Sequence, residues 1–133
     1  MIVVSDETTQ ADGHTALPSD RLFALDAILM DGVVVLAARG EIDLTTAPVL
    51  ADAIASHLAG APYGLIVDLS NVDFLASAGM TVLLEGHQSA RRSEKRFGVV
   101  ANGRGTSRPM KMMGLDQELS LHATLSDALS DFR

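Results

Sequence analysis

A single hydroxyl, that of Ser77, stands where a buried strand gives way to a helix. Residues 64–79 read GLIVDLSNVDFLASAG, an apolar strand and a short loop, and a helical pattern begins beside Ser77. A serine at a helix start is a common N-cap, because its oxygen accepts a hydrogen bond from a free backbone N–H. The same position suits a phosphoserine, since the helix dipole and the free N–H groups favour an anion. The residues alone leave both interpretations open.

Nucleophilic catalysis by Ser77 is disfavoured. A serine hydrolase needs a base within reach of its hydroxyl, and the Gly-x-Ser-x-Gly elbow needs a glycine where this chain has Leu75. His87 falls on the apolar face of the following helix. No spacing typical of metal ligands occurs among the four histidines, His14, His57, His87 and His122. We therefore expect no catalysed reaction, no metal and no other cofactor.

Other charged groups allow weaker hypotheses. Four carboxylates lie near strand ends that should converge: Glu41, Asp43, Asp68 and Asp73. They would either bind Mg²⁺ or remain solvated loop charges. Residues 102–106 (NGRGT) lack the Gly-Lys-Thr/Ser ending of a phosphate loop, which favours a simple turn. Seven of the ten Lys and Arg residues fall between Arg91 and Lys111, where they suit a helix end, with a binding patch or nucleotide site as the alternative.

Composition narrows the class of protein further. The 133 residues fit one domain, and a hydrophobic fraction of 47% with 4% aromatics indicates an aliphatic core. The absence of cysteine excludes disulfides and thiolate chemistry. A net charge of −7 argues against nucleic acid as a direct partner. No apolar run approaches the ~20 residues of a membrane span, and residues 1–4 lack the basic flank of a signal peptide, so we expect a cytoplasmic protein without membrane contact.

The spacing of apolar residues predicts the element order β-β-α-β-α-β-α-β-α. We expect strands at 21–29, 33–38, 65–69, 97–101 and 120–122, and helices at 45–59, 78–92, 108–113 and 124–131. Asp31-Gly32 between two apolar runs indicates a hairpin. Helices that join successive strands imply a partly parallel sheet. Residues 1–20 are polar and aperiodic, which predicts a flexible N-terminal tail before a compact domain at 21–133.

Three ordered motifs carry a family resemblance: GEID at 40–43, LIVDLS at 65–70 and VDFLASAGM at 72–80. Together they resemble the STAS domain of bacterial anti-sigma factor antagonists, the SpoIIAA-like family. Its pattern is a Gly-Glu-Leu-Asp turn, a strand ending in Asp-Leu-Ser, and Asp-Ser-Ser-Gly-Leu opening a helix. A later stretch, MMGLD at 112–116, is similar to the family's Leu-x-Gly-Leu segment. The resemblance covers residues 21–131 and implies an α/β STAS fold, with a mixed sheet of four to five strands and about four helices.

The resemblance implies a regulator rather than an enzyme. The unmodified antagonist binds an anti-sigma factor, usually a histidine-kinase-like ATPase acting as a serine kinase, and so releases the sigma factor. Phosphorylation at the serine matching Ser77 breaks that complex, and a PP2C-type phosphatase restores it. The implied partner-binding residues are Glu41, Asp43, Leu75, Ala76, Ser77, Ala78, Gly79 and Met80. The alternative is a STAS subunit of a stressosome or of a lipid or anion transport system, not controlled by a sigma-factor kinase.

Two positions depart from the family pattern. Ala76 replaces the acidic residue before the serine, and Ala78 replaces the second serine. Loss of the acid removes a charge that would repel a phosphate, but it also changes what a kinase recognises. Ser77 is then the one candidate hydroxyl of the loop, with Thr81 a poorer second one turn on.

Overall fold

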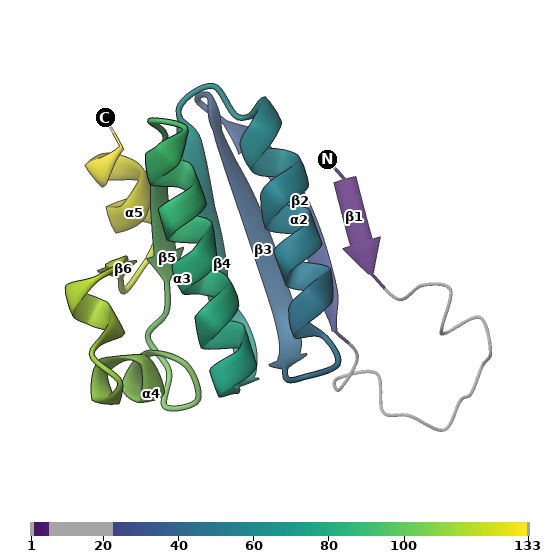
Figure 1. Ribbon diagram of the computed structural model, residues 1–133, viewed down its shortest axis with the longest axis vertical. Helices are drawn as coiled ribbons and strands as arrows, with labels where there is room; N and C mark the ends of the chain where they lie inside the picture. Colours follow the sequence, from purple (N-terminus) through teal and green to yellow (C-terminus); the bar gives the residue numbers. More distant parts are fainter. Residues whose placement is uncertain (1, 6–22, 133) are drawn as a thin grey trace.

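The computed structural model describes residues 2–5 and 23–132. Within them, six strands form one sheet in the order β1-β2-β3-β4-β5-β6 (Figure 1). The strands are β1 (Ile2–Ser5), β2 (Ala24–Met30), β3 (Val33–Ile42), β4 (Gly64–Leu75), β5 (Arg96–Val100) and β6 (Ser120–His122). The first three pair antiparallel, and β3 to β6 pair parallel.

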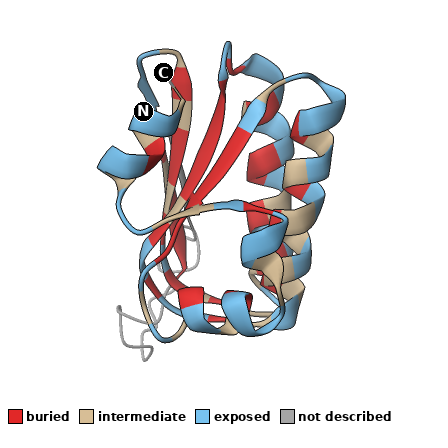
Figure 2. Cartoon of the chain, turned by 90° about the vertical axis from the view of Figure 1, so that its left-hand side faces the viewer, coloured by how far each residue is buried: buried red, intermediate tan, exposed pale blue. Residues whose placement is uncertain are grey.

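The helices lie on both sides of this sheet. They are α2 (Ala47–Gly60), α3 (Ser77–Arg92), α4 (Ser107–Met112), α5 (Leu125–Asp131) and a short 3₁₀ helix, η2 (Leu115–Gln117). Helices α2 and α3 run side by side over one face, and α5 packs on β5 and β6 from the other (Figure 1). Buried strand segments lie between these two helical layers (Figure 2).

Two apolar clusters hold the layers together. The larger one joins the sheet to α2 and α3 through fully buried residues such as Leu36, Leu50, Leu65 and Leu83. The smaller one joins α5 to the opposite face around Ile66 and Val100. Because β3, β4 and β5 are parallel, their carboxyl ends meet at one edge of the sheet, and the segment that contains Ser77 begins there.

From β2 onward the expected element order is confirmed, including the hairpin. Asp31 and Gly32 connect β2 to β3 with φ angles of 54° and 83°, the left-handed geometry of a tight hairpin turn. The described residues contain four α-helices, at the predicted places.

The sheet has one more strand than the four to five expected. Ile2–Ser5 pair antiparallel with β2, inside the segment 1–20 predicted to be a flexible tail. The two β-branched valines and the isoleucine of this stretch favour a strand, and the polar residues that follow conceal the signal. The rest of the predicted tail, residue 1 and residues 6–20, lies outside the described residues.

Two strands are longer than the sequence pattern indicates. β3 continues past residue 38 to Ile42, and β4 past residue 69 to Leu75, so parts of the predicted turn and loop are extended backbone. The backbone N–H and C=O groups of the two strands pair with each other even where the side chains are polar. The register of this pairing is irregular near Arg39 and Glu41. This pairing carries the 40–43 motif and the Ser77 segment to the same place.

Within residues 2–5 and 23–132, the search for a helix long and apolar enough to cross a membrane found none.

Candidate functional site at the start of helix α3

Ser77 is the first residue of α3, and its side chain is exposed. The N-cap is Ala76, with extended backbone (φ −79°, ψ 167°), and no side chain caps the helix. The interpretation of Ser77 as a plain N-cap is therefore wrong, because the cap position falls one residue earlier. In the described part of the chain the Ser77 hydroxyl has no hydrogen-bond partner, which leaves it available for modification.

The first turn of α3 also leaves backbone donors free. The N–H groups of Gly79 and Met80 both donate to the Ala76 carbonyl, at 2.9 and 3.1 Å. Among the described residues, no carbonyl accepts the N–H groups of Ser77 and Ala78, as is usual at a helix start. An anion on the Ser77 oxygen would lie beside these donors at the positive end of a 16-residue helix.

Thr81, the second candidate hydroxyl, is engaged within the helix. Its Oγ1 donates to the Ser77 carbonyl at 3.1 Å, the back-bonding typical of threonine inside a helix. Both side chains are exposed, but Ser77 alone combines a free hydroxyl with neighbouring free amides.

The end of β3 lies directly beside the Ser77 segment. Glu41 pairs with Phe74 and Ile42 with Leu75, and the Ala76 N–H donates to the Ile42 carbonyl at 2.8 Å. The structure thus brings the 40–43 motif into contact with the residue that caps α3, as the family resemblance implies.

Asp43 shapes the turn between β3 and α2. Its Oδ1 accepts the N–H groups of Thr45 and Thr46, both at 3.0 Å, and the Thr46 hydroxyl at 3.2 Å. The Asp43 N–H donates in turn to the Thr46 hydroxyl at 2.8 Å. The backbone hydrogen bond from Thr46 is the main cause that lowers the pKa of Asp43 below its ordinary value. Asp43 therefore acts first as a structural acceptor.

A third segment reaches the same edge from β5. The Leu75 N–H donates to the Gly105 carbonyl at 3.0 Å. A Cβ on Gly105 would lie 2.0 Å from the Asp73 carbonyl oxygen, so only glycine allows this approach. The ends of β3 and β4 and the loop before α4 form one continuous surface around Ser77.

Comparison with known proteins bears on this arrangement. A family described as "Mlab, STAS domain" matches residues 29–127, which is most of the chain. The chain belongs to the STAS domain family.

Relatives of this STAS domain include two proteins of Mycobacterium tuberculosis. The anti-sigma-F factor antagonist RsfB is 47% identical over 103 residues, which cover 77% of this chain and 84% of the relative. The anti-sigma-F factor antagonist RsfA is 31% identical over 126 residues, 92% of this chain and 96% of the relative. The crystal structure of an anti-sigma factor antagonist from Mycobacterium paratuberculosis superposes with a TM-score of 0.80 at 39% identity, covering 88% of this chain and 99% of that one.

Not all predicted partner-binding residues of the STAS domain are accessible. Glu41, Asp43, Ala76, Ala78 and Met80 are half-buried, and Ser77 is exposed. Leu75 and Gly79 are buried in the isolated chain, and their contact with a partner stays a prediction. A Cβ on Gly79 would lie 2.6 Å from both Ile42 Cγ2 and Leu75 Cδ1. Gly79 lets α3 approach the sheet, and Leu75 anchors the segment in the core.

Several exposed apolar side chains near these segments were missed by the sequence reasoning. Phe74 is 48% exposed, Met112 78% and Met113 66%, and Leu44, next to Asp43, is 80% exposed. Phe74 lies in the motif at 72–80. The alternation of apolar and polar residues along a strand does not reveal that no other segment covers its side chain. The sequence pattern places Met112 and Met113 at the end of a short helix, whose position in space only the fold defines.

The four carboxylates of the alternative cation site, Glu41, Asp43, Asp68 and Asp73, do not come together as one group in the described residues. Among the described residues, no group of three or more His, Asp or Glu side chains could hold a metal ion. Asp68 instead accepts the Ser70 N–H at 2.9 Å and the Ser70 hydroxyl at 2.6 Å. Residues 102–106 form the expected turn, with the N–H groups of Thr106 and Ser107 donating to the Gly103 carbonyl.

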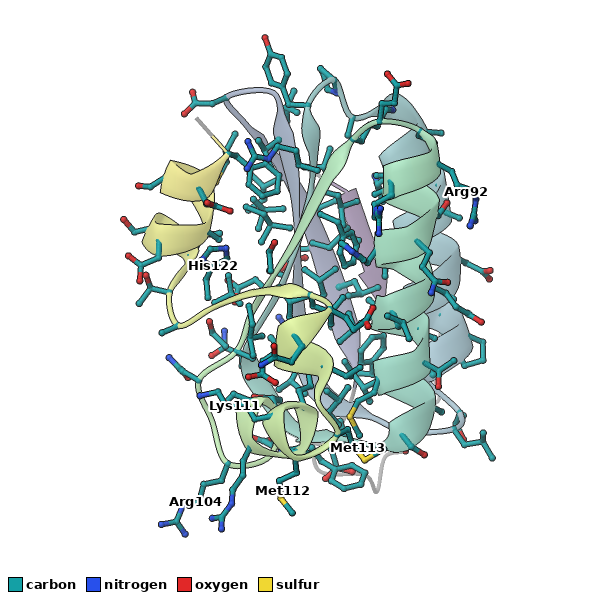
Figure 3. All side chains as sticks on the ribbon, turned by 60° about the vertical axis from the view of Figure 1, so that its left-hand side comes forward. Arg92, Arg104, Lys111, Met112, Met113 and His122 are labelled. Carbon is teal, nitrogen blue, oxygen red and sulfur yellow. The ribbon has the colours of Figure 1, made fainter. Side chains whose placement is uncertain are left out.

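The basic region divides between the two ends of the STAS domain. Arg91 and Arg92 occupy the last turn of α3, as predicted for a helix end. Lys95 Nζ donates to the Leu58 carbonyl at 2.7 Å and so closes the end of α2, and Arg96 lies 3.8 Å from Asp131. The remaining cations of the region, Arg104, Arg108 and Lys111, are exposed. Figure 3 shows Arg104 and Lys111 at the end of the domain opposite Arg92. Of the seven, Lys111 lines a polar cavity of about 520 Å³ between α4 and β6.

Proposed function

We propose that this STAS domain is a bacterial anti-sigma factor antagonist, switched off by phosphorylation of Ser77. The unmodified protein binds an anti-sigma factor and so frees the sigma factor for RNA polymerase. One observation carries the proposal: the exposed, unpartnered Ser77 hydroxyl opens α3 in a chain whose relatives are named anti-sigma-F factor antagonists. The role is one of binding in the cytoplasm, without catalysis, cofactor, nucleic-acid contact or membrane contact.

The partner is an anti-sigma factor of the histidine-kinase-like ATPase type, acting as a serine kinase. Phosphoryl transfer from ATP forms a bond between Ser77 Oγ and the γ-phosphorus, breaks the bond to the leaving β-phosphate oxygen, and releases ADP and a proton. The phosphate, with a charge of about −2, lies next to the free N–H groups of Ser77 and Ala78. The helix therefore tolerates the modification, while the docking surface gains bulk and charge. A PP2C-type phosphatase hydrolyses the ester and restores binding.

Alanines on both sides of Ser77 simplify this switch. Ala76 and Ala78 carry no hydroxyl or charge, so the phosphate meets no carboxylate in the adjacent positions and the kinase finds one acceptor. A kinase that uses this substrate must recognise the segment without the acidic residue of the family pattern. The neighbouring turn at 40–43 carries two half-buried carboxylates, Glu41 and Asp43, that a kinase could recognise instead.

Incubation with the anti-sigma-F factor of the same genome and ATP tests the modification. We expect one phosphate by intact-mass measurement, mapped to Ser77, and no mass gain for Ser77→Ala. Thr81→Ala is the matched control, and it should be modified like the wild type, because its hydroxyl is engaged with the Ser77 carbonyl. A mass gain that persists in Ser77→Ala would remove Ser77 as the acceptor.

The same pair of proteins tests the switch itself. Ser77→Glu should weaken binding of the anti-sigma factor by about tenfold or more. The complex would bury the new carboxylate without a partner charge, which costs more than about 1 kcal/mol. Ser77→Ala should bind as the wild type does. Equal affinities for the Glu and Ala variants would contradict control by charge at this position.

The transport or stressosome alternative receives less support. The two relatives from Mycobacterium tuberculosis, which align with 77% and 92% of this chain, are both named antagonists. Stable co-purification with a transport ATPase, in the absence of any anti-sigma factor binding, would reverse this preference.

A further inference from the structure

The α4 segment carries a positive charge that contrasts with the rest of the protein. Between residues 102 and 115 the chain has three cations and no carboxylate, although its net charge is −7. Arg104, Arg108 and Lys111 are exposed, and none takes part in an ion pair within the described residues. Figure 3 shows Arg104 and Lys111 at this end, with Arg92 at the other. These three cations therefore remain available to a partner.

Two exposed methionines accompany these cations. Met110 is fully buried and anchors α4 in the main core, whereas Met112 and Met113 are 78% and 66% exposed. Figure 3 shows them at the same end as Arg104 and Lys111. Methionine side chains are flexible and polarisable, so they adapt to an apolar partner surface. Their exposure in adjacent positions leaves apolar surface uncovered in the free protein.

This surface is continuous with the Ser77 site. The Gly105 carbonyl accepts the Leu75 N–H, and the Gly105 backbone packs against that of Asp73, so the loop before α4 is tied to the segment that leads into α3. Phe74, 48% exposed, lies in that segment. The α4 surface is therefore held next to the Ser77 site, and a partner that covers Ser77 can also contact α4.

A second exposed apolar group of the described residues lies at the opposite end of the sheet. Leu29, Met30 and Tyr63 surround the β2–β3 hairpin, at the amino end of β3, while Ser77 follows the carboxyl end of β4. This hairpin group has no continuity with the Ser77 site, and it supplies a matched control.

We propose that Arg104, Arg108, Lys111, Met112 and Met113 form a second contact surface for the anti-sigma factor that binds at Ser77. The inference rests on the proposed function and names the chemistry of the partner: an apolar groove bordered by acidic side chains. The cations accelerate association with an acidic partner, and the methionines fill the groove.

Binding of the purified anti-sigma-F factor of the same genome, measured by titration calorimetry, tests the apolar half. Met112→Gln combined with Met113→Gln should raise Kd by about tenfold, since central apolar contacts dominate interface energies. Met30→Gln, a single substitution of the same kind at the opposite end, should leave Kd within about twofold. The double variant should keep the wild-type melting temperature, because Met112 and Met113 are mostly exposed, whereas Met30 is 37% exposed and its variant is measured at a temperature at which it is fully folded.

Association kinetics test the charged half. Glu substitutions at Arg104, Arg108 and Lys111 should slow association by about tenfold at low salt and flatten its salt dependence. Glu substitutions at Arg91 and Arg92 are the control and should leave the rate near wild type.

The outcomes separate the two proposals. If Ser77→Glu weakens binding while all α4 variants bind as the wild type does, the second surface is wrong and the proposed function stands. If the wild-type chain does not bind the factor, both fail. A change in the chain's own oligomeric state, with unchanged affinity for the factor, would assign the α4 surface to self-association and overturn the inference.

Discussion

Ionisation of the Asp43 carboxylate stabilises the turn between β3 and α2. Its hydrogen bonds from Thr45 and Thr46 favour the ionised form, and the backbone bond from Thr46 is the largest cause of the lowered pKa. A group whose pKa is lowered in the folded state stabilises the fold above its unfolded pKa. That stability is lost as the pH falls from about 4 through the lowered pKa.

Asp43→Asn should therefore destabilise the protein at neutral pH by about 1 kcal/mol, because the amide still accepts the N–H bonds but without charge. The difference from the wild type should shrink as the pH is lowered below about 4. Urea unfolding at several pH values measures this. A gap that is constant with pH would show that the Asp43 charge is not what stabilises the turn.

At the scale of elements, the approach of the α4 loop to β4 depends on Gly105. A Cβ there meets the Asp73 carbonyl oxygen at 2.0 Å, and backbone atoms on both sides must move. Gly105→Ala should cost about 1–3 kcal/mol and, by shifting α4 relative to the Ser77 segment, should also weaken binding of the anti-sigma factor.

Gly103→Ala is the matched control for this loop. Its nearest neighbour, Thr106 Oγ1, is 3.6 Å from the added Cβ, an ordinary contact. Chemical unfolding should therefore give nearly wild-type stability for Gly103→Ala. Equal stability of the two variants would contradict a tight approach at Gly105.

At the scale of the whole molecule, the proposed switch changes the surface and not the fold. Ser77 is exposed, and the phosphate would lie at the positive end of α3, where an anion contributes about 0.3–1 kcal/mol of stability. The phosphorylated protein should therefore melt at the wild-type temperature or slightly above it, while its affinity for the anti-sigma factor falls. A melting temperature lowered by several degrees would point to a switch that acts by unfolding α3.

The order of the elements was predictable because apolar periodicity, the Asp31-Gly32 turn and helix-start residues are local signals. Ser77 could be singled out for the same reason, since a strand, a loop and a helix start follow one another within 16 residues. The polar tail composition concealed β1, whose partner β2 is about twenty residues away in the chain.

By itself, the sequence determined the α-helices and the strands from β2 to β6, but not β1 or the full lengths of β3 and β4, and it determined that one hydroxyl opens α3. The tertiary structure decided that Ala76 caps the helix, that Leu75 and Gly79 are buried, and that Gly105 brings α4 to the Ser77 site. The physical reason is that these properties depend on strand pairing and packing between distant segments. Residue types along one segment do not encode which side chains another segment will cover.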